Sequence, residues 1–295
     1  MAETILKISN LSKKYGNITA IDNLSLDIKK GNVYGILGPN GSGKTTTLSI
    51  ISEIISQDSG TFNWNINAKN YRTKIGTLIE SPNFYSHLTI YQNIKISALI
   101  KNVSNNIIIP TLEKVKLNNR LNTIYSNLSF GMKQRLALAS ILISDPEVIV
   151  LDEPTNGLDP EGIAEFRQII LNLAEQGKTI ILASHILDEI EKVCSHVAIL
   201  KNGKLIANDT VNKILKREPV YVIASDDNNK LFEFLVKSGI TKNINKSKTN
   251  IEVILQNDFN AKKLNEFLFK NNFILSKLYK QENNLEKQFL EIIKQ

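Results

Sequence analysis

Gly38-Pro39-Asn40-Gly41-Ser42-Gly43-Lys44-Thr45 is the most informative segment of this 295-residue chain. Gly38 and Gly43 have four residues between them, and a lysine and a hydroxyl side chain follow directly after Gly43. The residues before it, 34–37, predict a buried strand, and residues 46–51 after it predict a helix. A loop of this spacing between a strand and a helix is typical of phosphate binding. A plain glycine-rich turn is the alternative, but it does not explain why all eight positions agree.

The residue types in this loop suit a nucleoside triphosphate. Glycines let the backbone fold back, so that its N–H groups and the N-terminus of the helix face an anion. Lys44 then reaches the β- and γ-phosphates as a point charge, and the Thr45 hydroxyl completes the coordination shell of Mg²⁺. The segment therefore predicts a nucleoside triphosphate with Mg²⁺ as its ligands.

The composition is that of a globular protein, with 42% hydrophobic and 22% charged residues. The length allows one large domain and a small one. A single cysteine, Cys194, fits a reducing compartment, and we expect it to be packed on a helix. The first residues lack the pattern of a secretory signal, and no apolar run approaches the about 18 residues that a membrane-spanning helix needs. The formal charge of +7 is spread along the chain, which favours a solvated surface over a nucleic-acid or anionic-membrane surface.

Polar side chains follow two further apolar runs. Residues 148–151 end at Asp152 and Glu153, and residues 179–184 end before His185. Continuous apolar runs predict strands of a parallel sheet buried on both faces, and the carboxyl ends of such strands face a ligand crevice. There Asp152 can hold Mg²⁺ through water, and Glu153 can polarise an attacking water. The alternatives are carboxylates that serve solubility and an ordinary surface or core histidine, but delivery of all three to one edge favours function.

Glu80 is a third candidate carboxylate. It follows the predicted strand 75–79 and leads into Ser81-Pro82, where proline ends regular structure. A carboxylate at the end of a buried strand beside a phosphate loop is expected to face the same crevice.

The remaining motifs lie outside the predicted parallel strands. Residues 4–9 and 24–28 alternate as antiparallel strands do, and Tyr15 lies between them in a predicted turn, where it either stacks on a purine or packs at a strand edge. Residues 59–64 are predicted as a hairpin strand. Residues 89–143 are predicted to be helical.

Two helix N-termini stand out in the sequence. Ser126–Arg135 opens the last helix of the 89–143 region, where a capping serine beside glycine leaves free N–H groups, although a capped helix and nothing more is the alternative. Asp159 is suited to cap the next helix and Pro160 to begin it, and Gly177 is suited to end it.

From Pro219 onward the pattern changes. Strands are predicted at 221–224, 251–255 and 273–279, and helices at 229–238, 259–272 and 284–293. Residues 219–295 therefore predict a small accessory α+β domain, of ferredoxin-like type.

Over residues 1–215 the chain resembles the ATP-binding subunit of ABC transporters. Gly38–Thr45 matches the Walker A loop and Leu128–Met132 the ABC signature, while Val148–Glu153 resembles Walker B. Gly157–Asp159 resembles the D-loop. Tyr15 matches the aromatic residue that stacks on adenine, and His185 the switch histidine.

Three residues depart from the common family pattern. Glu80 stands where glutamine is usual, and Phe130 and Met132 stand where Gly and Gln are commoner. A glutamate at this position and an accessory domain after the ATPase core are similar to features of the bacitracin and lantibiotic resistance exporters.

The resemblance implies an α/β fold of the P-loop NTPase class, with a RecA-like core, an antiparallel β portion and a helical lobe over about 86–140. It implies an ATPase that powers a membrane transporter, an exporter of peptides or drug-like molecules, through separate permease subunits at the cytoplasmic face of the membrane. It also implies a nucleotide-dependent head-to-tail dimer, ATP and Mg²⁺ as ligands, and no nucleic acid. The alternative is a non-transport ABC ATPase acting on ribosomes or nucleic acid, whereas the signature and switch histidine argue against a P-loop kinase.

The site residues that follow from motif and resemblance fall into four groups. They are Tyr15, Gly38, Pro39, Asn40, Gly41, Ser42, Gly43, Lys44, Thr45, Thr46, Ser129 and Gly131 for ATP; Thr45, Glu80 and Asp152 for the metal; Glu153 and His185 for catalysis; and Asp159 for coupling across the dimer interface.

Glu80→Gln is expected to slow ATP hydrolysis less than Glu153→Gln does. A metal ligand at position 80 needs only an oxygen acceptor, which glutamine keeps, whereas the carboxylate at position 153 has to activate a water. Steady-state ATPase rates of the two variants test this. A Glu80→Gln protein without any hydrolysis would show that the role given to Glu80 is wrong.

Overall fold

The computed structural model describes residues 3–79, 84–215, 219–247, 249–256, 258–281 and 289. The chain forms two compact units, one of Met1–Val211 with Phe289–Gln295 and the other of Asn212–Gln288. Glu80 and Ser81-Pro82 therefore lie outside the described residues, as does the predicted helix 284–293 apart from Phe289.

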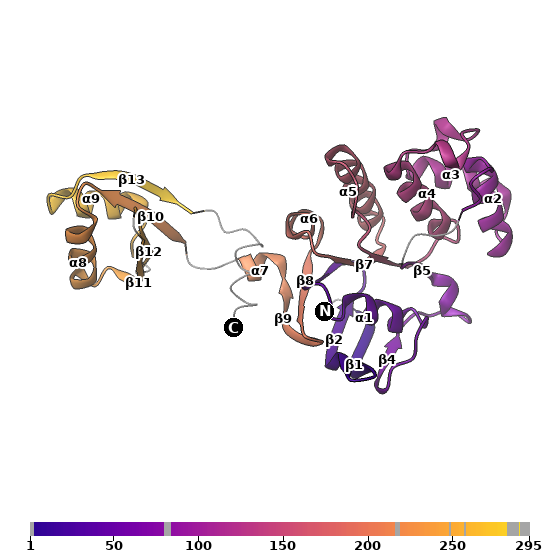
Figure 1. Cartoon of the computed structure of the whole chain (residues 1–295), viewed down its shortest axis with the longest axis horizontal. Coiled ribbons are helices and arrows are strands. Elements are labelled where there is room, and N and C mark those ends of the chain that lie inside the picture. Colours follow the sequence, from indigo (N-terminus) through magenta and orange to yellow (C-terminus); the bar gives the residue numbers. More distant parts are fainter. Residues whose placement is uncertain are drawn as a thin grey trace. The chain divides into compact units, whose positions relative to one another are not determined.

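A six-stranded sheet forms the centre of the first unit (Figure 1). Its strands in spatial order are β5 (Ile75–Leu78), β6 (Val148–Asp152), β7 (Thr179–Ser184), β3 (Val33–Leu37), β8 (His196–Lys201) and β9 (Lys204–Thr210). All neighbours are parallel except β8 and β9. Every residue of β3 and β7 is buried, as continuous apolar runs predict.

A second, antiparallel sheet of this unit has the order β2-β1-β4. It contains β1 (Thr4–Tyr15), β2 (Ile18–Lys29) and β4 (Ser59–Trp64). The predicted strands 4–9 and 24–28 are confirmed but extend further, because register shifts after Ile8 let pairing continue where the alternation of side chains breaks down. Two predictions need correction: Tyr15 is the last residue of β1 rather than a turn residue, and β4 pairs with β1 rather than with an adjacent hairpin strand.

Helix α1 (Lys44–Ile51) packs between the two sheets. Its Leu48, Ile50 and Ile51 are fully buried in a core that includes side chains of both sheets. Helices α5 (Pro160–Glu175) and α6 (Leu187–Val193) cover the opposite face of the six-stranded sheet (Figure 1). Phe166, Ile169, Ile170 and Leu173 form the buried side of α5.

Helix α6 lies very close to β3. A β-carbon at Gly35 would lie 2.9 Å from Cγ2 of Ile190 and 3.1 Å from Sγ of Cys194. Cys194 was expected on a helix, but it is the residue directly after α6, and burial raises the pKa of its thiol. Glycine at position 35 therefore allows α6 to pack directly on the strand that precedes the predicted phosphate loop.

The helical lobe lies at the end of the sheet that carries β5 (Figure 1). It contains α2 (Ile90–Ile100), α3 (Ile108–Lys114) and α4 (Phe130–Leu142), joined by short 3₁₀ turns. Thr89 caps α2 in a capping box with Gln92. Leu112, Val115 and Leu117 of this lobe are fully buried.

The second unit is a four-stranded antiparallel sheet with two helices. Its elements along the chain are β10 (Val220–Ser225), α8 (Asn228–Ser238), β11 (Thr241–Lys246), β12 (Ile251–Leu255), α9 (Ala261–Lys270) and β13 (Leu275–Lys280), preceded by α7 (Val211–Leu215). The order βαββαβ with sheet order β11-β12-β10-β13 is that of a ferredoxin-like arrangement. The predicted elements of this region that are described are present, but β11 was missed because Ile244 is the one apolar side chain of this edge strand.

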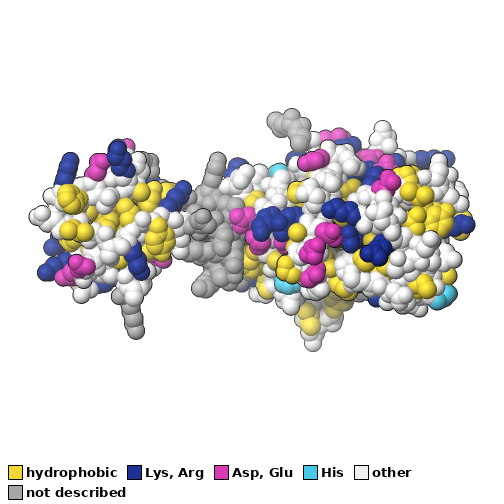
Figure 2. All heavy atoms as spheres, turned by 90° about the horizontal axis from the view of Figure 1, so that it is seen from above, with side chains coloured by type: hydrophobic (Ala, Val, Ile, Leu, Met, Phe, Trp, Pro, Cys, Tyr) yellow, Lys and Arg dark blue, Asp and Glu magenta, His cyan; other side chains and the backbone are white. Residues whose placement is uncertain are grey.

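Basic and acidic side chains lie among one another on the face of the molecule that Figure 2 shows. Of the helices in the described ranges, none combines the length and the apolar character that crossing a bilayer requires.

Candidate functional site

Three neighbouring strands of the large sheet bring the predicted site residues to one edge. Strands β6, β7 and β3 are adjacent and parallel, and Leu37 at the end of β3 pairs with Ser184 at the end of β7. Asp152 at the end of β6 pairs with Ala183. The segments that follow these strands therefore leave the sheet at the same level and in the same direction.

The loop after β3 depends on glycine at two points. A β-carbon at Gly38 would lie 2.2 Å from Oγ of Ser42, and one at Gly43, where φ is +100°, would lie 2.4 Å from the carbonyl oxygen of Ala20. No other residue type fits without moving backbone atoms. Gly43 is the N-cap of α1 and no side chain caps the helix, so its first N–H groups are available to an anion.

Lys44, Glu153 and His185 meet at this edge. The buried Lys44 Nζ donates to the carbonyl oxygen of Gly38 at 2.8 Å and lies 3.7 Å from Oε1 of Glu153. Oε2 of Glu153 is 2.7 Å from Nδ1 of His185 and accepts a hydrogen bond from the backbone N–H of His185 at 3.3 Å. One carboxylate thus joins the loop lysine and the histidine, each of which follows a different strand.

The conformation of Glu153 directs its side chain into this cluster. Its φ of 46° lies in the left-handed region, which costs a residue other than glycine about 1–2 kcal/mol. Hydrogen bonds hold it there, because its N–H donates to the carbonyl oxygen of Ala183 at 3.0 Å and its carbonyl oxygen accepts from Asn156 N–H at 3.1 Å. The sharp turn therefore takes the chain out of β6 while the carboxylate faces Lys44 and His185.

The oxygen groups at this edge suit Mg²⁺ bound together with a phosphate. Thr45 presents an exposed hydroxyl in the first turn of α1, and Asp152 is half-buried at the end of β6. No cluster of three His, Cys, Asp or Glu side chains suited to a metal occurs in the described part of the chain. Mg²⁺ is commonly held by one or two protein oxygens and completed by substrate phosphates, so the residues present fit this ion.

Tyr15 stands at the end of the β1–β2 hairpin, with 49% of its surface exposed. Nζ of Lys13 lies 5.7 Å from the centre of its ring. Asp58 accepts hydrogen bonds from Lys13 Nζ at 2.9 Å and from Lys14 N–H at 2.7 Å, and the bond from Lys13 lowers the pKa of this carboxyl. The carbonyl oxygen of Ala20 on the same hairpin approaches Gly43, so the hairpin is fixed beside the loop.

The signature segment lies in a different depression. Ser129 caps α4 by accepting a hydrogen bond from Met132 N–H at 3.3 Å. Ser129 and Gly131 line an open depression of about 310 Å³ together with Gly157, Leu158 and Asp159. The described residues that line it include none of 38–46. Within one chain, the signature therefore meets the segment before α5 and not the loop after β3.

Asp159 is the N-cap of α5. Its Oδ1 accepts a hydrogen bond from Gly162 N–H at 3.0 Å, and Pro160 is the first helical residue, both as predicted.

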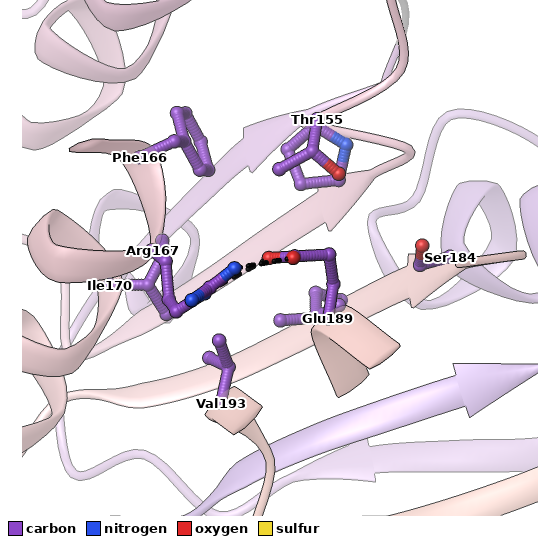
Figure 3. Close-up of a pocket in the computed structure, with 9 residues that line it drawn as sticks. Thr155, Phe166, Arg167, Ile170, Ser184, Glu189 and Val193 are labelled. Carbon is purple, nitrogen blue, oxygen red and sulfur yellow. Dashed lines mark hydrogen bonds and ion pairs between the residues drawn. The ribbon is translucent and has the colours of Figure 1, made fainter. Parts of the chain in front are cut away.

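An ion pair between α5 and α6 was not predicted from the sequence (Figure 3). Arg167 on α5 donates to both carboxylate oxygens of Glu189 on α6, at 2.6 and 3.2 Å. Phe166, Ile170 and Val193 surround the pair in a small cavity of about 20 Å³. The pair joins α5 to α6, the helix that begins just after His185, and no periodic signal connects two residues so distant in sequence.

These features define an ATPase of the P-loop class with a separate helical lobe. The sequence model of the ABC transporter family matches residues 21–156. The bacitracin transport ATP-binding protein BcrA of Bacillus licheniformis is 36% identical over 98% of this chain and 97% of its own length. The lantibiotic transport ATP-binding protein SrtF of Streptococcus pyogenes is 42% identical over 68% of this chain and 89% of its own length.

Solved structures agree with this assignment. CbiO1 of Clostridium perfringens, described as part of an ABC transporter complex, superimposes with a TM-score of 0.66 at 28% identity, over 72% of this chain and 90% of its own. A dimeric post-hydrolysis state of the cassette MJ0796 with ADP and Pi gives 0.62 at 27% identity, over 70% and 99%. The chain belongs to the family of ABC transporter ATP-binding proteins, and it is an ATP-hydrolysing subunit of a transporter. The predicted family, fold class and ATPase activity are confirmed.

Arg167→Met is expected to lower the free energy of unfolding by about 2 kcal/mol, because it leaves the buried Glu189 carboxylate without its partner. Urea unfolding followed by the fluorescence of the single tryptophan, Trp64, reports on the first unit. Lys192→Met, which breaks the exposed pair with Asp188, is the control and should cost less than about 0.5 kcal/mol. The double variant Arg167→Met/Glu189→Met should recover most of the loss; equal stability of wild type and Arg167→Met would contradict this role.

Proposed function

We propose that this chain powers the export of peptide or drug-like molecules, as the ATP-binding subunit of a transporter with separate permease subunits. The match to a bacitracin transport ATP-binding protein over 98% of the chain supports this, because it includes the second unit as well as the ATPase core. The match to a lantibiotic transport protein supports the same class of substrate. Such a subunit works at the cytoplasmic face of the membrane, bound to its permease.

ATP occupies the edge where β3, β6 and β7 end. The adenine stacks on the exposed ring of Tyr15, and the phosphates lie on the backbone N–H groups of residues 40–46 with Lys44 against them. Mg²⁺, when bound with ATP, offsets the phosphate charge, and Thr45 and Asp152 hold it. Glu80 also belongs to this set on sequence grounds and lies outside the described residues.

Glu153 serves as the general base. The observation that carries this role is its position between Lys44 and His185, which holds a carboxylate at the phosphate end of the site. Lys44 lies at Oε1 of that carboxylate and His185 at Oε2, and His185 contacts the terminal phosphate in this proposal. A water between Glu153 and that phosphate loses its proton to the carboxylate as it attacks.

The site is completed by a second chain. Ser129 and Gly131 lie at an N-terminus that faces an open depression apart from the loop of their own chain. In a head-to-tail dimer this N-terminus meets the ATP of the partner and supplies donors to its outer phosphate face. Asp159, in the same depression, then lies at the interface and couples the two chains. The dimeric state of the cassette MJ0796 supports a dimer of such subunits.

Residues 1–215 act as the ATP-binding domain and residues 219–295 as an accessory domain. The elements β10 to β13 support an independent ferredoxin-like body, since they enclose their own hydrophobic core. Nucleic acid is not an expected ligand of the chain.

Glu153→Gln is expected to reduce ATP hydrolysis at least about a hundredfold, the scale of a lost general base, while ATP binding is retained. Because hydrolysis no longer opens the dimer, ATP should convert this variant into a stable dimer on size-exclusion chromatography with light scattering. Glu175→Gln, an exposed carboxylate at the end of α5, is the control. Near-normal turnover of Glu153→Gln would exclude the assigned role.

Affinity purification of the chain from detergent-solubilised membranes tests the transporter partnership. A multi-span membrane protein should co-purify, and expression of the pair should raise resistance to bacitracin or a lantibiotic only when Glu153 is intact. Recovery of ribosomal proteins or nucleic acid without a membrane protein would favour the alternative of a non-transport ABC ATPase.

A further inference from the structure

Phe130 is an exposed aromatic residue in the signature segment. It is the first residue of α4, between Ser129 and Gly131, and 51% of its surface is exposed. The common signature has glycine at this position, so neither anion binding nor helix capping requires a ring there. The contacts of the ring therefore indicate its role.

The ring of Phe130 packs on Gly157, in the segment before α5. A β-carbon at Gly157 would lie 3.3, 3.7 and 3.8 Å from Cε1, Cζ and Cδ1 of Phe130, which form one edge of the ring. Conversely, the segment before α5 contributes a side chain to the signature: a β-carbon at Gly131 would lie 3.7 Å from Cδ2 of Leu158. Each segment thus places a side chain on a glycine of the other, and the two backbones approach closely.

The segment that carries Gly157 begins at Glu153. Asn156 N–H donates to the carbonyl oxygen of Glu153 at 3.1 Å, and Leu158 N–H donates to that of Thr155 at 3.2 Å. Two consecutive hydrogen-bonded turns therefore join Glu153 to Leu158, and Asp159 fixes the far end by capping α5. A displacement of Gly157 is passed on to the backbone of Glu153 through this short, hydrogen-bonded path.

We propose that Phe130 is a positioning residue that couples the two ATP sites of the dimer. The inference rests on the proposed function in one respect, namely that Ser129 and Gly131 of each chain meet the ATP of the partner. When that ATP draws the N-terminus of α4 toward it, the Phe130 ring carries Gly157 along, and Glu153 of the same chain is placed for its own ATP. Binding of ATP at one site thereby favours binding and hydrolysis of ATP at the other, which is positive cooperativity.

Phe130→Ala removes the ring and keeps a good helix former at this position. We expect the Hill coefficient of ATP hydrolysis by the full chain to fall from near 2, the number of sites, to about 1. The maximal rate should change much less than in Glu153→Gln, because Phe130 does not touch the reacting atoms. Phe130→Leu, which retains an apolar side chain over Gly157, should restore most of the cooperativity. Leu99→Ala, at an exposed apolar residue on α2 of the same lobe, is the control and should leave the Hill coefficient unchanged.

A second measurement requires no turnover. In a Glu153→Gln background, the ATP dependence of dimer formation should be steep with Phe130 and shallow with Phe130→Ala, in samples whose thermal unfolding shows them to be folded. Equal steepness of both curves, or a wild-type Hill coefficient of 1, would overturn the inference while leaving the ATPase function intact. A wild-type chain that neither hydrolyses ATP nor dimerises with it would instead overturn the proposed function, and the inference with it.

Discussion

The carboxylate of Glu153 is the point on which the site depends, because it contacts both Lys44 and His185. This contact exists only if β3, β7 and β6 are neighbours, parallel and in the observed register. A shift of one residue in any of these strands would turn the segment after it toward the other face of the sheet. The fully buried apolar runs of β3 and β7 stabilise that register, so the hydrophobic core determines the geometry of the polar groups.

Contacts on both faces of the sheet fix the neighbouring helices, the phosphate loop and the hairpin in place. Gly35 lets α6 lie on β3, and the Arg167–Glu189 pair holds α6 to α5. On the other face, the turn at Gly203 donates to the Ser42 carbonyl oxygen at 3.1 Å and accepts from Asp22 N–H at 2.9 Å. The phosphate loop, the hairpin of Tyr15 and the sheet are thus joined by backbone hydrogen bonds, which depend little on side-chain identity.

Much of the fold could be predicted from local pattern. The loop at Gly38–Thr45, the strands before Asp152 and His185, and the cap at Asp159 were visible because spacing and hydrophobic runs are properties of short segments. The full length of β1 and β2 was not visible, since register shifts interrupt the alternation. Strand β11 was missed because an edge strand with polar neighbours carries little apolar signal. The Arg167–Glu189 pair and the packing of Phe130 on Gly157 join distant segments that no local pattern relates.

The amino-acid sequence by itself determined which groups are present: a loop able to bind phosphate, carboxylates and a histidine at strand ends, and a capped helix in the signature. It did so because each of these is a short-range pattern with a direct physical meaning. The tertiary structure decided which groups meet. Because β3 pairs with β7 and β8 rather than with its neighbours in the chain, Lys44 reaches Glu153, while Ser129 and Gly131 come to lie beside Leu158 and Asp159. Sheet order is set by the burial of long-range apolar surfaces, and only the folded chain expresses it.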